Sequence, residues 1–217
     1  KNCDLAVELH RDTILAKLKF LRRLKMAGPL VGIKVLDLTR ILAGPFATMR
    51  MGDMGASITK IELPDQGDDT RAFGPPFVEG ESTYFLSINR NKKSLTLNLR
   101  APEGKTILMK LIERSDVIIE NFRPGTLGRL GFSYEKIQEI NPKIIYCAIS
   151  GYGHTGPRST EPSYDLMVQG ESGLMAITGV SDGQPTKVGI SLADVTGGLA
   201  AVEGVLLALI NRDKTGK

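Results

Sequence analysis

Residues 32–62 of the chain are GIKVLDLTRILAGPFATMRMGDMGASITKIE. Their first part, Gly32–Thr39, is short and rich in β-branched residues, which is typical of a strand. Ala43–Met54 is typical of a helix, because Gly44-Pro45 places a proline in the first helical turn, where it is tolerated. Ser57–Glu62 is typical of a second strand. The stretch therefore predicts a strand–helix–strand unit, the building block of a parallel sheet.

The same alternation continues along the chain. Further strands are expected within Tyr84–Leu99, as a pair joined by the polar turn Asn89–Lys92, and at Asp116–Glu120 and Lys143–Ser150. Further helices are expected at Pro102–Arg114, Ser133–Glu139, Asp165–Ile177 and Thr196–Asn211. Two segments rich in glycine and proline, residues 64–83 and 151–162, are expected to be long loops. This order predicts an α/β fold with a Rossmann-like, mostly parallel sheet flanked by helices, and ligands at the carboxyl ends of the strands.

Composition and charge exclude several classes of function. Hydrophobic residues make up 41% of the 217 residues and charged residues 24%, which is ordinary for a globular protein. The first 25 residues carry the whole net charge of +4, so the neutral remainder argues against a nucleic-acid partner. The longest apolar run, Gly204–Ile210, is far shorter than the ~20 residues of a membrane span, and no membrane partner is expected. Cys3 and Cys147 lie far apart without histidines at ligand spacing, so no metal site is predicted.

The two ends of the chain differ from its middle. Residues 12–25 have the pattern of a basic amphipathic helix, and we expect residues 1–25 to be a leader or an extension. Mitochondrial presequences share that pattern, but the acidic residues of this segment are untypical of them. The polar tail after Asn211 is typical of a truncated domain. We therefore expect a cytoplasmic protein, with the mitochondrial matrix as the alternative, and one domain over residues 26–217 whose C-terminal half is absent.

Two common chemistries lack their required residues. A dinucleotide site needs G-x-G-x-x-G between the first strand and helix, where this chain has Ala43-Gly44-Pro45. Glu62, at the end of the second strand, is therefore expected to be structural. The chain has two histidines, His10 and His154, and neither lies beside a plausible catalytic triad.

Several separate phrases of the sequence are specific when taken together. They are LDLTRILAGPFAT, GDDTR, NRNKKS, ENFRPG, GYGHTGP, SYD and LADVTGG. With them, residues 26–217 resemble the class III CoA-transferases, the family of formyl-CoA and carnitine CoA-transferases. Within that family the chain looks most like the succinate–hydroxymethylglutarate (dicarboxylate) CoA-transferases. The resemblance implies the N-terminal, CoA-binding part of the class III CoA-transferase fold, in a family whose members are much longer.

The resemblance places the family's nucleophile at Asp194. It implies CoA transfer from a succinyl-CoA-like donor to a carboxylic or dicarboxylic acid, through aspartyl-anhydride and aspartyl-CoA intermediates. No metal or redox cofactor is implied, since coenzyme A is itself a substrate. The local sequence agrees: Asp194 precedes the expected helix, whose N–H groups favour an ionised carboxylate that can attack a thioester. Gly197 and Gly198 would let a substrate approach the backbone. The alternative is that Asp194 only caps the helix.

Other positions match the family's CoA-binding and substrate-binding residues, motif by motif. They are Ile41, Leu42, Ala43, Leu97, Arg100, Asn121, Phe122, Arg129, Leu130, Tyr164 and Asp165. Each also has an alternative role in the core or on the solvated surface. Many relatives have an arginine after the second strand where this chain has Leu63, so Lys60 or Arg71 could replace it. Arg71 and Arg90 are also possible partners for a dicarboxylate.

Tyr164 separates two activities of the family. The related α-methylacyl-CoA racemases have a histidine at this position, and a phenol is a poor base at neutral pH. Transfer is therefore favoured over racemisation. The remaining alternative is an inactive, truncated CoA-binding fragment. Family members form interlocked homodimers, and loss of the second half would leave an apolar face exposed.

Overall fold

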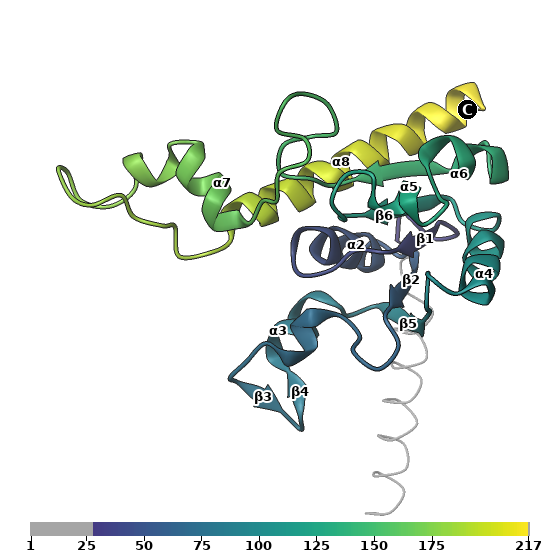
Figure 1. The fold of residues 1–217 in the computed structure, drawn as a ribbon, viewed down its shortest axis with the longest axis horizontal. Helices are drawn as coiled ribbons and strands as arrows, with labels where there is room; N and C mark the ends of the chain where they lie inside the picture. The colour runs from purple at the N-terminus through teal and green to yellow at the C-terminus, as the bar shows by residue number, and fades with distance from the viewer. Residues whose placement is uncertain (1–27, 217) are drawn as a thin grey trace, which may run out of the picture.

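The computed structural model describes residues 28–216, and its centre is a sheet of five parallel strands in the order β5-β2-β1-β6-β7 (Figure 1). The strands are β1 (Lys34–Asp37), β2 (Ser57–Glu62), β5 (Lys92–Thr96), β6 (Val117–Glu120) and β7 (Ile145–Ala148). The chain moves from β1 to one edge of the sheet and then returns to build the other side. This is the order of a doubly wound sheet, and it confirms the predicted α/β fold.

Helices cover both faces of this sheet. On one face lie α2 (Ala43–Asp53) and α8 (Leu192–Thr215); on the other lie α4 (Pro102–Ile112), α5 (Thr126–Arg129) and α6 (Tyr134–Ile140) (Figure 1). Successive strand residues alternate between the two faces. Val35 packs with the α2 and α8 side, whereas Leu36 packs with the α4 and α6 side. Both faces of the inner strand β6 are buried, which explains its continuous apolar sequence Val117–Ile119, whereas the edge strand β5 is partly exposed and begins with two lysines.

The prediction of two strands within Tyr84–Leu99 is wrong in its first half. Residues Thr83–Ile88 form the short helix α3, and only β5 follows as a strand. The aromatic and β-branched residues favoured a strand, but the side chain of Ser82 accepts a hydrogen bond from the Phe85 N–H and caps a helix. Phe85 and Ile88, spaced as on a helix, then become buried.

The secondary structure differs from the prediction in two further regions. The predicted loop 64–83 includes a 3-10 turn, η1 (Asp69–Ala72), and a small hairpin of β3 (Phe77–Val78) and β4 (Glu81–Ser82). The single helix expected at Asp165–Ile177 is divided into α7 (Asp165–Glu171) and η2 (Leu174–Ile177). Gly173, with a φ of 79°, separates them, because only glycine adopts this left-handed conformation readily.

Helix α8 begins at Leu192, earlier than the predicted start at Thr196. It is the one helix among residues 28–216 that is long and apolar enough to cross a membrane, by length and composition alone. One stripe of it, including Val202, Val205 and Leu209, is buried against the sheet and α2. The predicted leader at residues 1–25 lies outside the described residues.

Candidate active site

The loops that follow β1 and β6 meet at the carboxyl edge of the sheet, where the strand order changes direction. Asn121, directly after β6, joins them with two hydrogen bonds to the backbone of Arg40. Its Oδ1 accepts the Arg40 N–H at 2.8 Å, and its Nδ2 donates to the Arg40 carbonyl at 2.8 Å. The Arg40 guanidinium lies 5.3 Å from the ring centroid of Phe122. Crevices of this kind, at the switch point of a doubly wound sheet, are the usual ligand sites.

The next residue, Ile41, has a left-handed backbone with a φ of 69°. For a β-branched residue this conformation is a real outlier, and it persists only where surrounding groups enforce it. The carboxylate of Asp68 accepts the Ile41 N–H at 3.4 Å. Lys60 donates to the Thr39 carbonyl at 2.8 Å and pairs with Asp68, also at 2.8 Å. The loop that carries Ile41, Leu42 and Ala43 is thus held from beneath by a buried ion pair.

Helix α8 brings Asp194 to the same loop. The contact is made by Gly198, where an added Cβ would lie 2.6 Å from the Ala43 carbonyl oxygen. A Cβ at Gly197 would meet nothing within 4 Å. Of the two glycines predicted to admit a substrate, Gly198 is therefore required by the packing of α8 on α2. The first turn of α8 consequently lies beside the residues predicted to line the CoA site.

Asp194 is the third residue of α8, inside its first turn, so the prediction that it precedes or caps the helix is wrong. Burial, followed by the nearby carboxylate of Asp165, raises the pKa of Asp194 to about 6. The helix terminus was expected to favour the ionised form, but burial and Asp165 shift the pKa of Asp194 in the opposite direction. Because this pKa still lies below 7, the carboxylate is mainly ionised at neutral pH.

Asp165 and Tyr164 occupy different environments at the start of α7. Asp165 is 8% exposed and accepts the Ala193 N–H at 2.8 Å and the Asp194 N–H at 3.4 Å. The side chain of Tyr164 is 68% exposed. The carboxylate of Asp165 is therefore directed to the start of α8.

The remaining predicted CoA-binding residues belong to the other face of the sheet or to its surface. Leu97 is buried in the core with the α4 side, and Phe122 and Leu130 pack against the same cluster. Arg100 and Arg129 are exposed, and the Arg129 guanidinium donates to the Thr126 hydroxyl at 2.9 Å. No contact within residues 28–216 joins either arginine to Asp194.

Three basic residues considered as anion partners are already engaged. Lys60 is buried in its pair with Asp68. Arg71 binds both carboxylate oxygens of Glu62, at 2.7 and 2.8 Å, which agrees with a structural role for Glu62. Arg90 pairs with Asp53 at 2.6 Å. Replacement of the family arginine by Lys60 or Arg71 is therefore not supported by these contacts.

Sequence reasoning missed two residues of the site. Burial, followed by the charges of Asp194, Asp68 and Asp165, raises the pKa of Tyr84, so this residue of α3 lies within electrostatic range of these carboxylates. Gln169 is fully buried and donates to Asp165 at 2.6 Å. Gln169 could have been found, since it lies one helical turn after Asp165. Tyr84 could not, because its segment was predicted as a strand.

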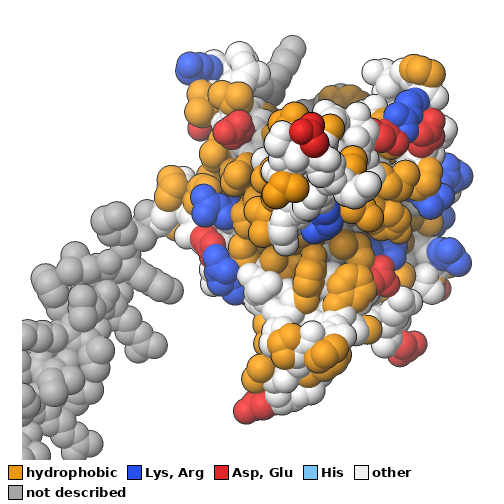
Figure 2. Space-filling view, turned by 90° about the vertical axis from the view of Figure 1, so that its left-hand side faces the viewer, with side chains coloured by type: hydrophobic (Ala, Val, Ile, Leu, Met, Phe, Trp, Pro, Cys, Tyr) orange, Lys and Arg blue, Asp and Glu red, His pale blue; other side chains and the backbone are white. Residues whose placement is uncertain are grey.

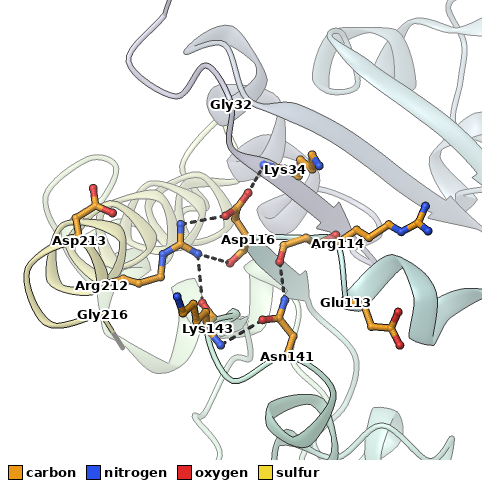
Figure 3. A pocket seen from close by; sticks show the side chains of 11 residues that line it. Gly32, Lys34, Glu113, Arg114, Asp116, Asn141, Lys143, Arg212, Asp213 and Gly216 are labelled. Carbon is orange, nitrogen blue, oxygen red and sulfur yellow. Dashed lines mark hydrogen bonds and ion pairs between the residues drawn. The ribbon is translucent and has the colours of Figure 1, made fainter.

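An open groove of about 590 Å³ lies at the opposite, amino edge of the sheet (Figure 3). There Arg212 of α8 bonds to the carboxylate of Asp116 at 3.1 Å and to the Lys143 carbonyl at 3.2 Å. These bonds tie the end of α8 to the sheet, far along the helix from Asp194. Within residues 28–216, no group of three or more His, Cys, Asp or Glu side chains could hold a metal ion.

Fold and site together define a doubly wound α/β protein with an ionisable aspartate at the edge where sheets of this kind usually bind ligands. The pattern of the family described as CoA-transferase family III matches residues 30–217. The chain therefore belongs to CoA-transferase family III, as the motifs predicted.

Individual relatives agree with this assignment. Succinyl-CoA:glutarate CoA-transferase of Homo sapiens is 52% identical over 189 residues, covering 87% of this chain and 43% of that protein. Acetyl-CoA:oxalate CoA-transferase of Acetobacter aceti is 47% identical over 194 residues, covering 89% and 50%. The crystal structure of a CAIB/BAIF family protein from Brucella suis superposes with a TM-score of 0.85 at 46% identity, covering 88% and 52%. The chain spans about half the length of the curated relatives it matches.

Proposed function

We propose that this chain is the nucleophile-bearing part of a CoA-transferase that moves CoA from a succinyl-CoA-like donor to a dicarboxylic acid. The observation that carries the proposal is the position of Asp194. Its half-buried carboxylate, ionised at neutral pH, lies beside the strained loop 41–43 at the ligand-binding edge of the sheet. The names of the relatives, which combine succinyl-CoA with dicarboxylates, support this substrate class.

The proposed reaction has four steps, none of which needs a metal or a redox cofactor. A carboxylate oxygen of Asp194 attacks the donor's thioester carbonyl; the C–S bond then breaks, which releases CoA as a thiolate and leaves a mixed anhydride of the donor acid and Asp194. The thiolate attacks the Asp194 carbonyl carbon, which releases the donor acid and leaves an aspartyl-CoA thioester. The acceptor carboxylate attacks this thioester and again expels the thiolate. Attack of the thiolate on the new acyl group forms the product and restores Asp194.

The neighbouring residues have distinct proposed roles. The loop 41–43 would contact the CoA chain, because its backbone is fixed in place before any ligand binds. The exposed guanidinium groups of Arg100 and Arg129 would reach the phosphates of the nucleotide. The proposed partners are acyl-CoA, small carboxylic acids and, at full natural length, a second copy of the chain.

Trapping of the covalent intermediate tests the function. The protein at its full natural length is incubated with succinyl-CoA, digested, and searched by peptide mass spectrometry for a CoA adduct on Asp194. We expect the adduct in the native protein and its loss in Asp194→Asn, an isosteric change that removes the nucleophilic oxygen. Asp213→Asn, near the other end of α8, is the matched control and should keep the adduct.

The same measurement separates the alternatives. Measurable CoA binding without any adduct would exclude Asp194 as the nucleophile and favour a racemase-type or binding-only protein. Exchange of the α-proton of an α-methylacyl-CoA in deuterated water would then identify the racemase. If an adduct forms at full length but not with residues 1–217 alone, this chain by itself is an inactive fragment.

A further inference from the structure

The N-terminus of α8 is capped by a side chain from another helix. Ser191, its own N-cap residue, makes no side-chain capping bond. The carboxylate of Asp165, the first residue of α7, accepts the N–H groups of Ala193 and Asp194 instead. A carboxylate in this position satisfies backbone donors that the helix itself leaves unpaired. Asp165 lies 28 and 29 residues away from them in sequence, so the contact fixes α8 relative to α7.

Gln169 in turn fixes Asp165. Its side-chain nitrogen donates to the second oxygen of Asp165 at 2.6 Å and to the Ile190 carbonyl at 3.2 Å. Its side-chain oxygen accepts the Val188 N–H at 3.0 Å. The amide is fully buried and bonded at both ends, so the segment that leads into α8 is tied to α7 from two sides.

We propose that Asp165, held by Gln169, is a positioning residue for Asp194: it sets the place and the charge environment of the first turn of α8. The assignment as a CoA-binding residue, which the family resemblance implied for Asp165, is thereby replaced by a role that acts through Asp194. The consequence for catalysis rests on the proposed function, whereas the effect on Asp194 itself does not.

The charges around Asp194 explain what this arrangement does. Asp165 of α7 accepts the N–H groups of Ala193 and Asp194, and Tyr84 of α3 lies within electrostatic range of the Asp194 carboxylate. Among the described residues, no basic side chain contributes to the shift of the Asp194 pKa, which is due to burial and then to Asp165. Removing the charge of Asp165 should therefore make the Asp194 carboxylate easier to ionise and less basic as a nucleophile.

The test measures the protonation of Asp194 in the protein at its full natural length, without substrate turnover. Labelling of carboxyl groups with a carbodiimide and an amine, followed by peptide mass spectrometry across a pH series, gives the midpoint of Asp194 protonation. Asp165→Asn keeps an acceptor for the Ala193 N–H and removes the charge. We expect this midpoint to fall by about one pH unit, and the pH profile of kcat to shift in the same direction. Asp213→Asn should change neither.

A second variant keeps the charge of Asp165 and removes the hydrogen bonds of Gln169 to Asp165, Ile190 and Val188. In Gln169→Met we expect kcat to fall about tenfold, while KM for the acyl-CoA donor changes less than twofold. An unchanged Asp194 midpoint in folded Asp165→Asn would overturn the proposal. If that variant does not fold, wild-type kcat in folded Gln169→Met would overturn it. A shifted midpoint in a protein that forms no CoA adduct would support the positioning role and count against the proposed function alone.

Discussion

At Asp194, two effects of local structure act in opposite directions on one carboxyl group. The positive end of the helix dipole, at the first turn of α8, favours its ionised form. Burial and the carboxylate of Asp165 disfavour that form, and they prevail, since the pKa is raised to about 6. A carboxylate of this kind is more basic than an ordinary aspartate yet mainly ionised at pH 7. That combination suits a nucleophile that must form and release an acyl group.

A second carboxylate, Glu62, gives a prediction for stability. Burial would raise its pKa, but hydrogen bonds from Arg71, Ser94 and the Asp68 N–H outweigh it and lower the pKa to about 2. A lowered pKa stabilises the fold above the unfolded value near 4.5, and the stabilisation is lost as the pH falls from there toward 2. We expect Glu62→Gln to remove roughly 2–3 kcal/mol of this pH-dependent stability.

Urea unfolding of wild type and Glu62→Gln, from about pH 2.5 to about pH 7, measures this difference in the free energy of unfolding. The two free energies of unfolding should differ most above pH 5 and converge at low pH. Glu139→Gln, which removes an exposed carboxylate paired with Lys136, should follow the wild type throughout. A constant difference between Glu62→Gln and wild type across the pH range would contradict the prediction.

At the scale of single residues, the sequence indicated which residues belong to the candidate site, but it did not indicate which groups contact them. Motifs predicted Asp194 and the 41–43 loop as site residues, and the structure brings the start of α8 and this loop together. The pairing of Asp165 with α8 was not found, because it joins residues that are distant in sequence. The positive φ of Ile41 could not be found either, since nothing in an isoleucine predicts a left-handed backbone.

Among the elements, α8 determines the geometry of the site through one glycine. A Cβ at Gly198 would lie 2.6 Å from a backbone oxygen of α2 and 3.0 Å from the Phe46 ring, and the oxygen cannot move without moving the helix. We expect Gly198→Ala to cost about 1–3 kcal/mol and to reduce formation of the CoA adduct, because the first turn of α8 is displaced. Thermal unfolding and adduct yield measure both effects.

Gly197→Ala is the matched control for this variant. A methyl group there meets nothing within 4 Å, and alanine is the better helix former, so stability should rise by up to ~1 kcal/mol. If both alanine variants have the same stability, packing of α8 on α2 does not depend on Gly198.

The elements themselves were predicted where the apolar pattern is strong. β2 was placed with its observed bounds, Ser57–Glu62, and the start of α4 at Pro102 was correct. The error at α3 arose because the apolar residues of a short segment can fit the period of a helix or that of a strand. There the capping bond of Ser82 and the burial of Phe85 decided the outcome.

For the whole molecule, the exposed apolar surface is the main feature. Figure 2 shows the side that carries α7 and the β3–β4 hairpin, and apolar side chains cover much of it. Phe77, Val78 and Leu166 are each about half exposed, at 49%, 55% and 54%. Leu207 and Ile210 of α8 are 67% and 52% exposed. Surfaces of this kind usually contact other protein, and the chain spans about half the length of its curated relatives.

Residues 1–217 expressed alone should therefore bind a hydrophobic dye and self-associate as their concentration rises. We expect the double variant Leu207→Gln/Ile210→Gln to reduce dye fluorescence and the apparent mass in analytical ultracentrifugation. Val31→Gln changes an exposed valine of the turn before β1 and should have little effect. A monodisperse wild-type monomer that binds no dye would contradict this prediction.

The packing of α8 against α2 also determines when, during synthesis, the apolar side of α2 becomes covered. Helix α2 and the central strand β1 leave the ribosome early, whereas Gly198 follows about 150 residues later. At about 5–20 residues per second, the apolar side of α2 stays uncovered for roughly 8–30 seconds. The nascent chain therefore exposes an apolar surface, of the kind that favours aggregation, until α8 has been made. A mutation that weakens α8 would accordingly lower the yield of protein in the cell even where the finished fold tolerates it.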